Sequence, residues 1–100
     1  MKTYDEVVDF LRGEFIGLKI EIIESRNKDL TGIKGKIVDE TKSMFEIETK
    51  KYARHSSKRE IKKAQKKVCK FKFLKEKLVV DGLIIDFRPE DRIGRKFKDW

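Results

Sequence analysis

Residues 15–49 read FIGLKIEIIESRNKDLTGIKGKIVDETKSMFEIET, and this stretch decides the fold. Apolar and charged residues alternate with period two in three runs, around Ile20, Gly35 and Ile47, which is the pattern of half-buried strands. The residues between the runs are of types that favour turns: Asn27, Asp29, Gly32, Asp39, Thr41 and Ser43. The stretch therefore predicts an antiparallel meander with one face toward a core and one face toward solvent.

Further short strands are predicted after this meander. They are residues 60–64, which also fit a helix, then 68–74, 78–80 and 83–87, with one helical turn at 65–67. Gly35 lies inside a predicted strand, where a glycine permits the sharp bend that a small barrel requires. Closing the strands into a barrel also removes exposed sheet edges. We therefore expect a mainly β fold in a single domain, residues 1–100, with the barrel over residues 15–87.

One α-helix is predicted at each end of the barrel. Residues 3–13 place apolar side chains at helical spacing behind the capping sequence Thr3–Glu6, and residues 89–98 begin with Pro89, a favoured first helical residue. Two interpretations of the apolar stripes stay open, namely that they cover an open end of the sheet or that they dock a partner protein. The candidate docking residues are Tyr4, Val7, Leu11, Phe15, Ile93, Phe97 and Trp100.

The charge balance points to a polyanionic partner. Charged residues make up 44% of the chain, and 26 Lys and Arg against 18 Asp and Glu give a formal net charge of +8. Nucleic acid is the first candidate for such a partner. No apolar run is long enough for a membrane span or a signal peptide, so we expect a cytoplasmic protein with no membrane partner.

Residues 50–72 hold the excess of positive charge. They contain eleven Lys or Arg and one acid, Glu60, so their net charge of +10 exceeds that of the whole chain. The part through Ser57 lacks apolar periodicity and is predicted to be a loop at the tip of a long hairpin; this basic loop and hairpin cover residues 50–67. A solvated loop without a ligand is the alternative, but dense like charge is costly to hold together without an anion. The candidate RNA contacts here are Arg59, Lys62, Lys63, Lys66 and Lys67.

No catalytic or metal site is predicted. Cys69 and His55 are the only residues of their kinds, which excludes an internal disulfide and the usual zinc ligand sets, and Cys69 is interpreted as a core residue. The acids that a metal-dependent nuclease would need are scattered over turns and a helix start: Asp39, Glu40, Asp81, Asp86, Glu90 and Asp91. We therefore expect no catalytic residue and no cofactor bound by this chain.

Three motifs, FIG, LTGIKGKIVDET and RPEDR, occur in this order, and VCKFKF lies between the second and the third. With them, residues 13–97 resemble the archaeal ribonuclease P protein component 1 family, which is related to a subunit of the eukaryotic enzyme. The resemblance implies a small Sm-like, SH3-like antiparallel β-barrel with an N-terminal and a C-terminal α-helix. It also implies a non-catalytic subunit that binds the ribonuclease P RNA, while that RNA, with Mg²⁺, removes the 5′ leader from precursor tRNA.

The resemblance also implies contacts and partners. The candidate RNA contacts in the matching motifs are Lys34, Lys36, Lys42, Arg88 and Arg92. The implied protein partner is a small zinc-ribbon subunit, which forms a heterodimer through the terminal helices and the adjacent strand surface. Other ribonuclease P proteins and, indirectly, precursor tRNA are further partners. The chain departs from the family pattern between Thr49 and Gln65, where it is longer and richer in lysine.

Two other functions stay open at this point. One is a general RNA-binding or ribosome-associated β-barrel module without a role in tRNA processing, and the other is a protein adaptor that acts through its terminal helices. For an RNA binder, we expect phosphate neutralisation to anchor the barrel with little reading of bases. If about five phosphates are bound, log affinity should fall against log salt with a slope on the order of −4.

Overall fold

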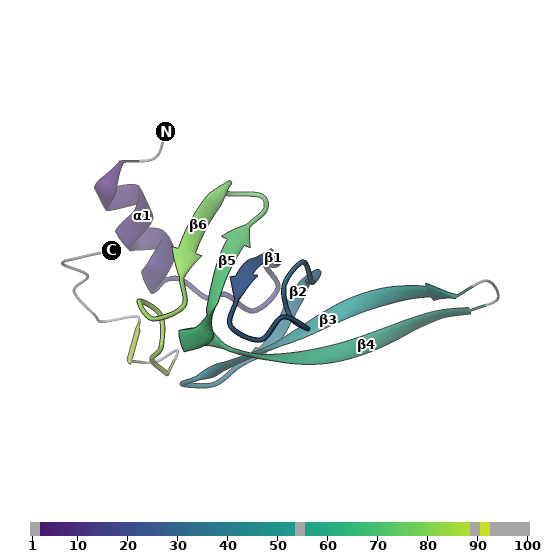
Figure 1. The fold of residues 1–100 in the computed structure, drawn as a ribbon. Coiled ribbons are helices and arrows are strands. Elements are labelled where there is room, and N and C mark those ends of the chain that lie inside the picture. Colours follow the sequence, from purple (N-terminus) through teal and green to yellow (C-terminus); the bar gives the residue numbers. More distant parts are fainter. Residues whose placement is uncertain (1–2, 54–55, 89–90, 93–100) are drawn as a thin grey trace.

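The computed structural model of the chain describes residues 3–53, 56–88 and 91–92, and the side chains of Tyr4 and of residues 50–59 lie outside this description. In the described part, one α-helix precedes six strands, and a short 3₁₀ helix separates the fourth strand from the fifth (Figure 1). The elements are α1 (Tyr4–Arg12), β1 (Lys19–Ser25), β2 (Lys34–Glu40), β3 (Met44–Ala53), β4 (Ser56–Gln65), η1 (Lys66–Val68), β5 (Cys69–Phe73) and β6 (Leu78–Asp81).

The strands form one antiparallel sheet in the order β4-β3-β2-β1-β5-β6. The expected mainly β, antiparallel fold is confirmed. A closed barrel is not, because β4 and β6 are the outer strands of the described sheet and no ladder joins them. The register shifts between Ile22 and Glu24 in β1 and between Ile37 and Asp39 in β2. Irregularities of this kind bend a strand and increase its twist, so the sheet curves around its core without closing.

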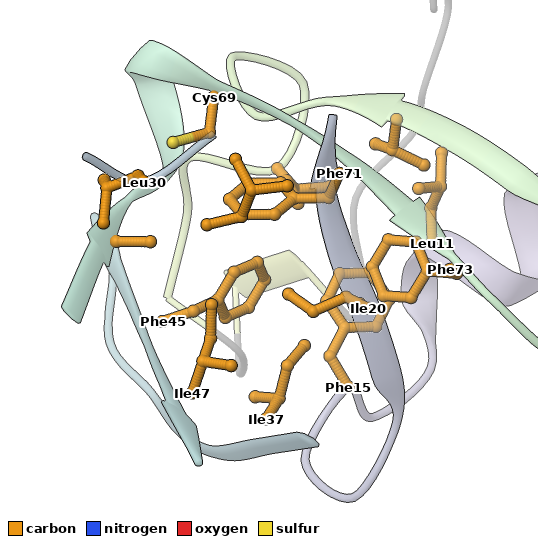
Figure 2. Close-up of a cluster of buried hydrophobic side chains, with 14 of the residues drawn as sticks. Leu11, Phe15, Ile20, Leu30, Ile37, Phe45, Ile47, Cys69, Phe71 and Phe73 are labelled. Atoms are coloured by element: carbon orange, nitrogen blue, oxygen red, sulfur yellow. The ribbon is translucent and has the colours of Figure 1, made fainter. Parts of the chain in front are cut away.

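Phenylalanine rings fill the space that the curved sheet encloses (Figure 2). The fully buried ones are Phe15, Phe45, Phe71 and Phe73. The rings of Phe45 and Phe71 meet edge to face with 5.1 Å between their centroids, a favoured geometry for aromatic pairs. Isoleucines from the inner faces of β1, β2 and β3 complete the core: Ile20, Ile22, Ile37 and Ile47. The period-two pattern of the sequence therefore separates core from solvent, as it predicts.

Helix α1 covers one end of this core. Thr3 caps the helix, because its Oγ1 accepts a hydrogen bond from the Glu6 amide at 3.3 Å, as the capping sequence predicts. Further along the helix, Val7 and Leu11 are buried and join the hydrophobic cluster. Across the described residues, the helices are too short or too polar to span a membrane.

Three of the residues predicted to dock a partner belong to this core instead. Val7, Leu11 and Phe15 are 2%, 0% and 0% exposed, so their apolar surface is already covered within the chain. The docking prediction is wrong at these three positions, and the alternative, in which the stripe covers an end of the sheet, is correct there. The other predicted docking positions fall outside the description: the side chain of Tyr4, and Ile93, Phe97 and Trp100.

The segment after β6 also differs from the prediction. Residues 83–87 form no strand: residues 83–85 are in turns, and the Ile84 amide donates a hydrogen bond to the Asp81 carbonyl at 3.0 Å. The Asp81 carboxylate accepts a second bond from the backbone two residues further on, at 3.0 Å, and such local bonds compete with a strand ladder. The predicted helix at 89–98 is described only at residues 91–92, which are helical; its remaining positions lie outside the description.

Replacing Gly35 with alanine is expected to destabilise the protein, because β2 and β3 approach each other closely at this position. A Cβ atom on residue 35 would lie 2.7 Å from Cγ2 of Ile47 and would overlap the carbonyl oxygen of Glu48. We expect the free energy of unfolding to fall by about 1–3 kcal/mol, the usual cost of overpacking. Urea unfolding followed by circular dichroism measures this, with Lys36→Ala on the exposed side of the same strand as the control. If the two variants are equally stable, β2 and β3 can move apart to accommodate the added methyl group without loss of stability.

Candidate nucleic-acid interface

Strands β3 and β4 form a long hairpin that extends away from the rest of the molecule (Figure 1). The two ten-residue strands pair along their whole length, so the loop predicted at 50–57 is mostly paired strand. Among the described side chains of the hairpin, the buried ones are Phe45, Ile47 and Ala64, which lie near its base. The molecule is accordingly elongated, at 48 × 26 × 23 Å. We name residues 50–59 the hairpin arm.

The hairpin arm places like charges opposite one another. Its sequence holds five Lys or Arg and no acid. The strand register pairs Lys50 with Arg59 and Lys51 with Lys58, and like charges directly opposite each other destabilise an antiparallel pair. A bound anion would relieve this repulsion, so the arm is the strongest candidate for contact with nucleic-acid phosphates.

The outer face of the rest of the sheet is closer to charge balance. Ion pairs on this face include Lys34–Glu21 at 4.0 Å, Lys63–Glu46 at 4.0 Å and Lys70–Glu24 at 3.3 Å. Lys19 and Lys36 differ from these, because they are opposite each other in the β1–β2 register, are exposed, and make no ion pair with a described residue. One phosphate could therefore contact both of them. Sequence reasoning missed Lys19, because its proximity to Lys36 depends on a register that the alternation within one strand does not reveal.

Most of the other predicted RNA contacts lie at the surface. The exposed ones are Lys34, Lys36, Lys42, Lys63, Lys67 and Arg88, Lys62 is half-buried, and the side chain of Arg59 lies outside the description. Lys62 is paired with Glu60 at 2.8 Å. Exposed ion pairs contribute at most about 1 kcal/mol, so a phosphate can compete with the carboxylate partners of these lysines.

Lys66 and Arg92, both predicted to contact RNA, are buried instead, with 0% exposure each. Their common partner is Glu40: Lys66 Nζ donates to Oε2 at 2.8 Å, and Arg92 Nη2 donates to Oε1 at 2.9 Å. Lys66 Nζ also donates to the carbonyls of Thr41 and Phe87 at 2.8 and 2.9 Å. The prediction is therefore wrong for both cations, because burial keeps them from a phosphate and the ammonium protons of Lys66 are already used. We name Glu40, Lys66 and Arg92 the Glu40 cluster.

The Glu40 cluster joins parts of the chain that are not joined by a described ladder. Glu40 ends β2, Lys66 follows β4, and Arg92 lies beyond β6. Burial lowers the pKa of Lys66, with the hydrogen bond to Glu40 opposing this shift, and burial also lowers the pKa of Arg92 against the charge of Glu40. The Arg92 guanidinium lies 3.6 Å from the centre of the Phe15 ring, a cation–π contact. The cluster thus holds the segment after β6 against the open side of the sheet.

Cys69 is a core residue, as predicted. Its side chain is buried, and its thiol lies 3.3 Å from Oγ of Ser25. Burial raises the pKa of the thiol, which is the opposite of what a nucleophilic cysteine requires. Within the described part of the chain, His, Cys, Asp and Glu side chains form no group of three that could hold a metal ion. Cys69 therefore contributes to the packing of the core.

Comparisons with known proteins find relatives along nearly the whole chain. A model of the family described as "Ribonuclease P/MRP, subunit p29" matches residues 9–95. The Ribonuclease P protein component 1 of Methanocaldococcus jannaschii is 39% identical over 90 residues, which cover 90% of each chain. The protein of the same name from Methanococcus aeolicus is 42% identical over 92 residues, which cover 91% of each chain. The solved structure of Mth11, described as a homologue of human RNase P protein Rpp29, matches with a TM-score of 0.52 and 31% identity over 81% of this chain and 99% of that chain.

Proposed function

This chain belongs to the ribonuclease P/MRP subunit p29 family, and we propose that it is a non-catalytic protein subunit of ribonuclease P. The observation that carries the proposal is the extent of the match, which runs from residue 9 to residue 95 and so includes the sheet and the hairpin. In this proposal, the RNA of the enzyme, with Mg²⁺, carries out removal of the 5′ leader from precursor tRNA, and the protein supports it.

The distribution of charge supports binding to the ribonuclease P RNA. The hairpin arm has five cations and no acid in its sequence, and Lys19 and Lys36 are two exposed cations at opposite positions of β1 and β2. Both groups suit the regularly spaced phosphates of a folded RNA. Proteins recognise RNA helices mainly by their backbone and shape, and less by the edges of their bases. The arm and the Lys19–Lys36 pair are therefore the proposed anchors on the RNA.

A zinc-ribbon subunit of ribonuclease P is the proposed protein partner, and other ribonuclease P proteins complete the proposed assembly. Because the inward stripe of α1 is buried, the proposed docking surface is reduced to Tyr4, Ile93, Phe97 and Trp100. This surface is separate in sequence from the hairpin arm. The two partners therefore need not compete for the same residues.

Reconstituted cleavage tests the proposed function. The chain, together with the zinc-ribbon subunit, is added to ribonuclease P RNA and precursor tRNA, and the matched control omits only this chain. We expect faster cleavage at low magnesium, because protein cations neutralise phosphates that Mg²⁺ otherwise screens. RNA binding without faster cleavage would instead identify a general RNA-binding module. If the chain neither binds the RNA nor speeds up cleavage, the proposal is overturned.

A further inference from the structure

A pocket of about 240 Å³ lies where the ends of β1 and β6 meet the start of β5. Its lining includes Arg26, Lys67 and Leu83. Leu83 is 62% exposed, more than any other large apolar side chain in the described part of the chain. The volume is below the roughly 300–1,000 Å³ of sites for drug-sized ligands. The pocket therefore suits a single planar ring system rather than a larger molecule.

The lining of the pocket carries a small excess of positive charge, because it holds the three cations Arg26, Lys67 and Lys70 against two acids. Glu24 pairs with Lys70 at 3.3 Å, and the Asp81 carboxylate accepts a hydrogen bond from the Leu83 amide at 3.0 Å. Arg26 and Lys67 are exposed and make no ion pair with a described residue. The Arg26 amide donates a hydrogen bond to the Val68 carbonyl at 3.0 Å, which fixes the backbone at the rim. The pocket thus combines an apolar contact surface with two cations that are available to phosphates.

The pocket follows directly after the hairpin in the chain. Strand β4 leads directly into η1, and the exposed Lys63 and Lys67 lie on either side of this junction. Along the chain from the hairpin arm, Lys63 is paired with Glu46 and Lys66 is buried, so Lys67 is the first exposed cation at the pocket. Charge complementarity and this position after the hairpin select an RNA strand as the occupant.

We propose that the pocket receives one unpaired base of the bound RNA, while Arg26 and Lys67 bind the phosphates on either side of that base. This inference rests on the proposed function. Leu83 offers an apolar surface on which one face of the base can stack. Stacking is tolerant of sequence because every base has a π-face, so the pocket selects an unpaired nucleotide rather than a particular base.

Nuclear magnetic resonance of the ¹⁵N-labelled full chain tests the pocket in the absence of RNA. Adenosine monophosphate is the probe, and inorganic phosphate at the same ionic strength is the control. We expect the nucleotide to shift the amide signals of Arg26, Lys67 and Leu83 further than phosphate does. Equal shifts with the two ligands, or shifts confined to residues outside the pocket, would overturn the inference.

Two pairs of variants test the pocket with the ribonuclease P RNA. Leu83→Ser removes the apolar contact and is expected to weaken RNA binding on the order of fivefold, the lower end of the range for one stacked base. Val79→Ser is its control, because Val79 is 47% exposed on β6 and does not line the pocket. Arg26→Gln is compared with Lys28→Gln, which removes the same charge from an exposed position outside the pocket lining.

The outcomes separate the pocket from the function on which it rests. If Leu83→Ser and Arg26→Gln bind the RNA no more weakly than their controls, the pocket inference is overturned while RNA binding stands. If the unchanged protein does not bind the RNA, the proposed function fails first. Circular dichroism of all four variants shows whether each is folded. If one variant does not fold, the other pair still tests the pocket.

Discussion

Replacing Glu40 with alanine is expected to lower the free energy of unfolding by about 3–5 kcal/mol, because two buried cations lose their common partner. Lys66 and Arg92 each donate to the Glu40 carboxylate within 3 Å, at 2.8 and 2.9 Å, and both are fully buried. The penalty of an unpaired buried charge far exceeds that of a broken surface pair. Since domains of this size are stable by only about 5–15 kcal/mol, the variant would lose a large share of its stability.

Urea unfolding followed by circular dichroism measures this loss. Glu24→Ala is the matched control, because Glu24 pairs with Lys70 at 3.3 Å with both side chains largely exposed, at 68% and 46%; we expect it to cost at most about 1 kcal/mol. Glu40→Gln should fall between the two, since the amide oxygen still accepts a bond but carries no charge. If Glu40→Ala is no less stable than Glu24→Ala, the cluster does not hold Phe87 and Arg92, in the segment after β6, in place.

Shortening the hairpin is expected to weaken RNA binding about a hundredfold or more near 0.1 M salt. Each phosphate contact raises the affinity close to tenfold when the salt concentration falls from 1 M to 0.1 M, so the loss of two or more contacts gives this factor. The variant replaces the hairpin arm, residues 50–59, with Asn-Gly, a sequence that suits a two-residue hairpin turn. It removes five cations and no acid. The slope of log affinity against log salt should shrink in magnitude by about one for each phosphate that the variant no longer binds. Filter binding to ribonuclease P RNA over a salt series measures both quantities.

A second variant separates charge from length in this experiment. Changing Lys50, Lys51, Lys58 and Arg59 to Gln keeps the strands at full length and removes both like-charged cross-strand pairs. If the charges bind RNA, this variant should lose nearly as much affinity and salt dependence as the shortened one. Unchanged binding by both variants would place the RNA interface elsewhere on the protein. Lys66 is left intact, because its removal disturbs the Glu40 cluster and would confuse weaker binding with unfolding.

The strands and the core were predictable from the sequence because both depend on local alternation. Each β5 residue that the pattern assigns to the core, Cys69, Phe71 and Phe73, is buried, and Lys70 between them is exposed. The Thr3 cap is equally local, since it involves residues three positions apart. The features that depend only on residues close together in the sequence could therefore be predicted.

The Glu40 cluster could not be predicted, because a register shift decides it. Uninterrupted alternation from Ile37 would place Asp39 on the inner face and Glu40 on the outer face. The irregularity between Ile37 and Asp39 reverses this order, and Glu40 comes to lie opposite the buried Phe45. A shift of one residue moves every later side chain to the other face. The sequence signal for the Glu40 cluster is weak, since an acidic residue near the end of a strand is equally typical of a turn.

Residues 50–57 were predicted to be a loop for a different reason. Apolar periodicity detects strands that cover a core, but β3 and β4 also pair along positions that lie beyond the buried Phe45, Ile47 and Ala64. The backbone ladder between the two strands continues over these positions. A lysine-rich segment of this kind gives no local sign that distinguishes a paired strand from a loop.

The outer part of β3 and β4 can gain or lose residues without altering the buried side chains near the base of the hairpin. Each added cross-strand pair moves the tip outward by about 3.4 Å and turns the next side chains to the opposite face. Insertions in multiples of two pairs, about 7 Å each, preserve which residues point to which side. Evolution can therefore adjust the span of the protein across a ligand in discrete steps while the anchoring sheet stays the same.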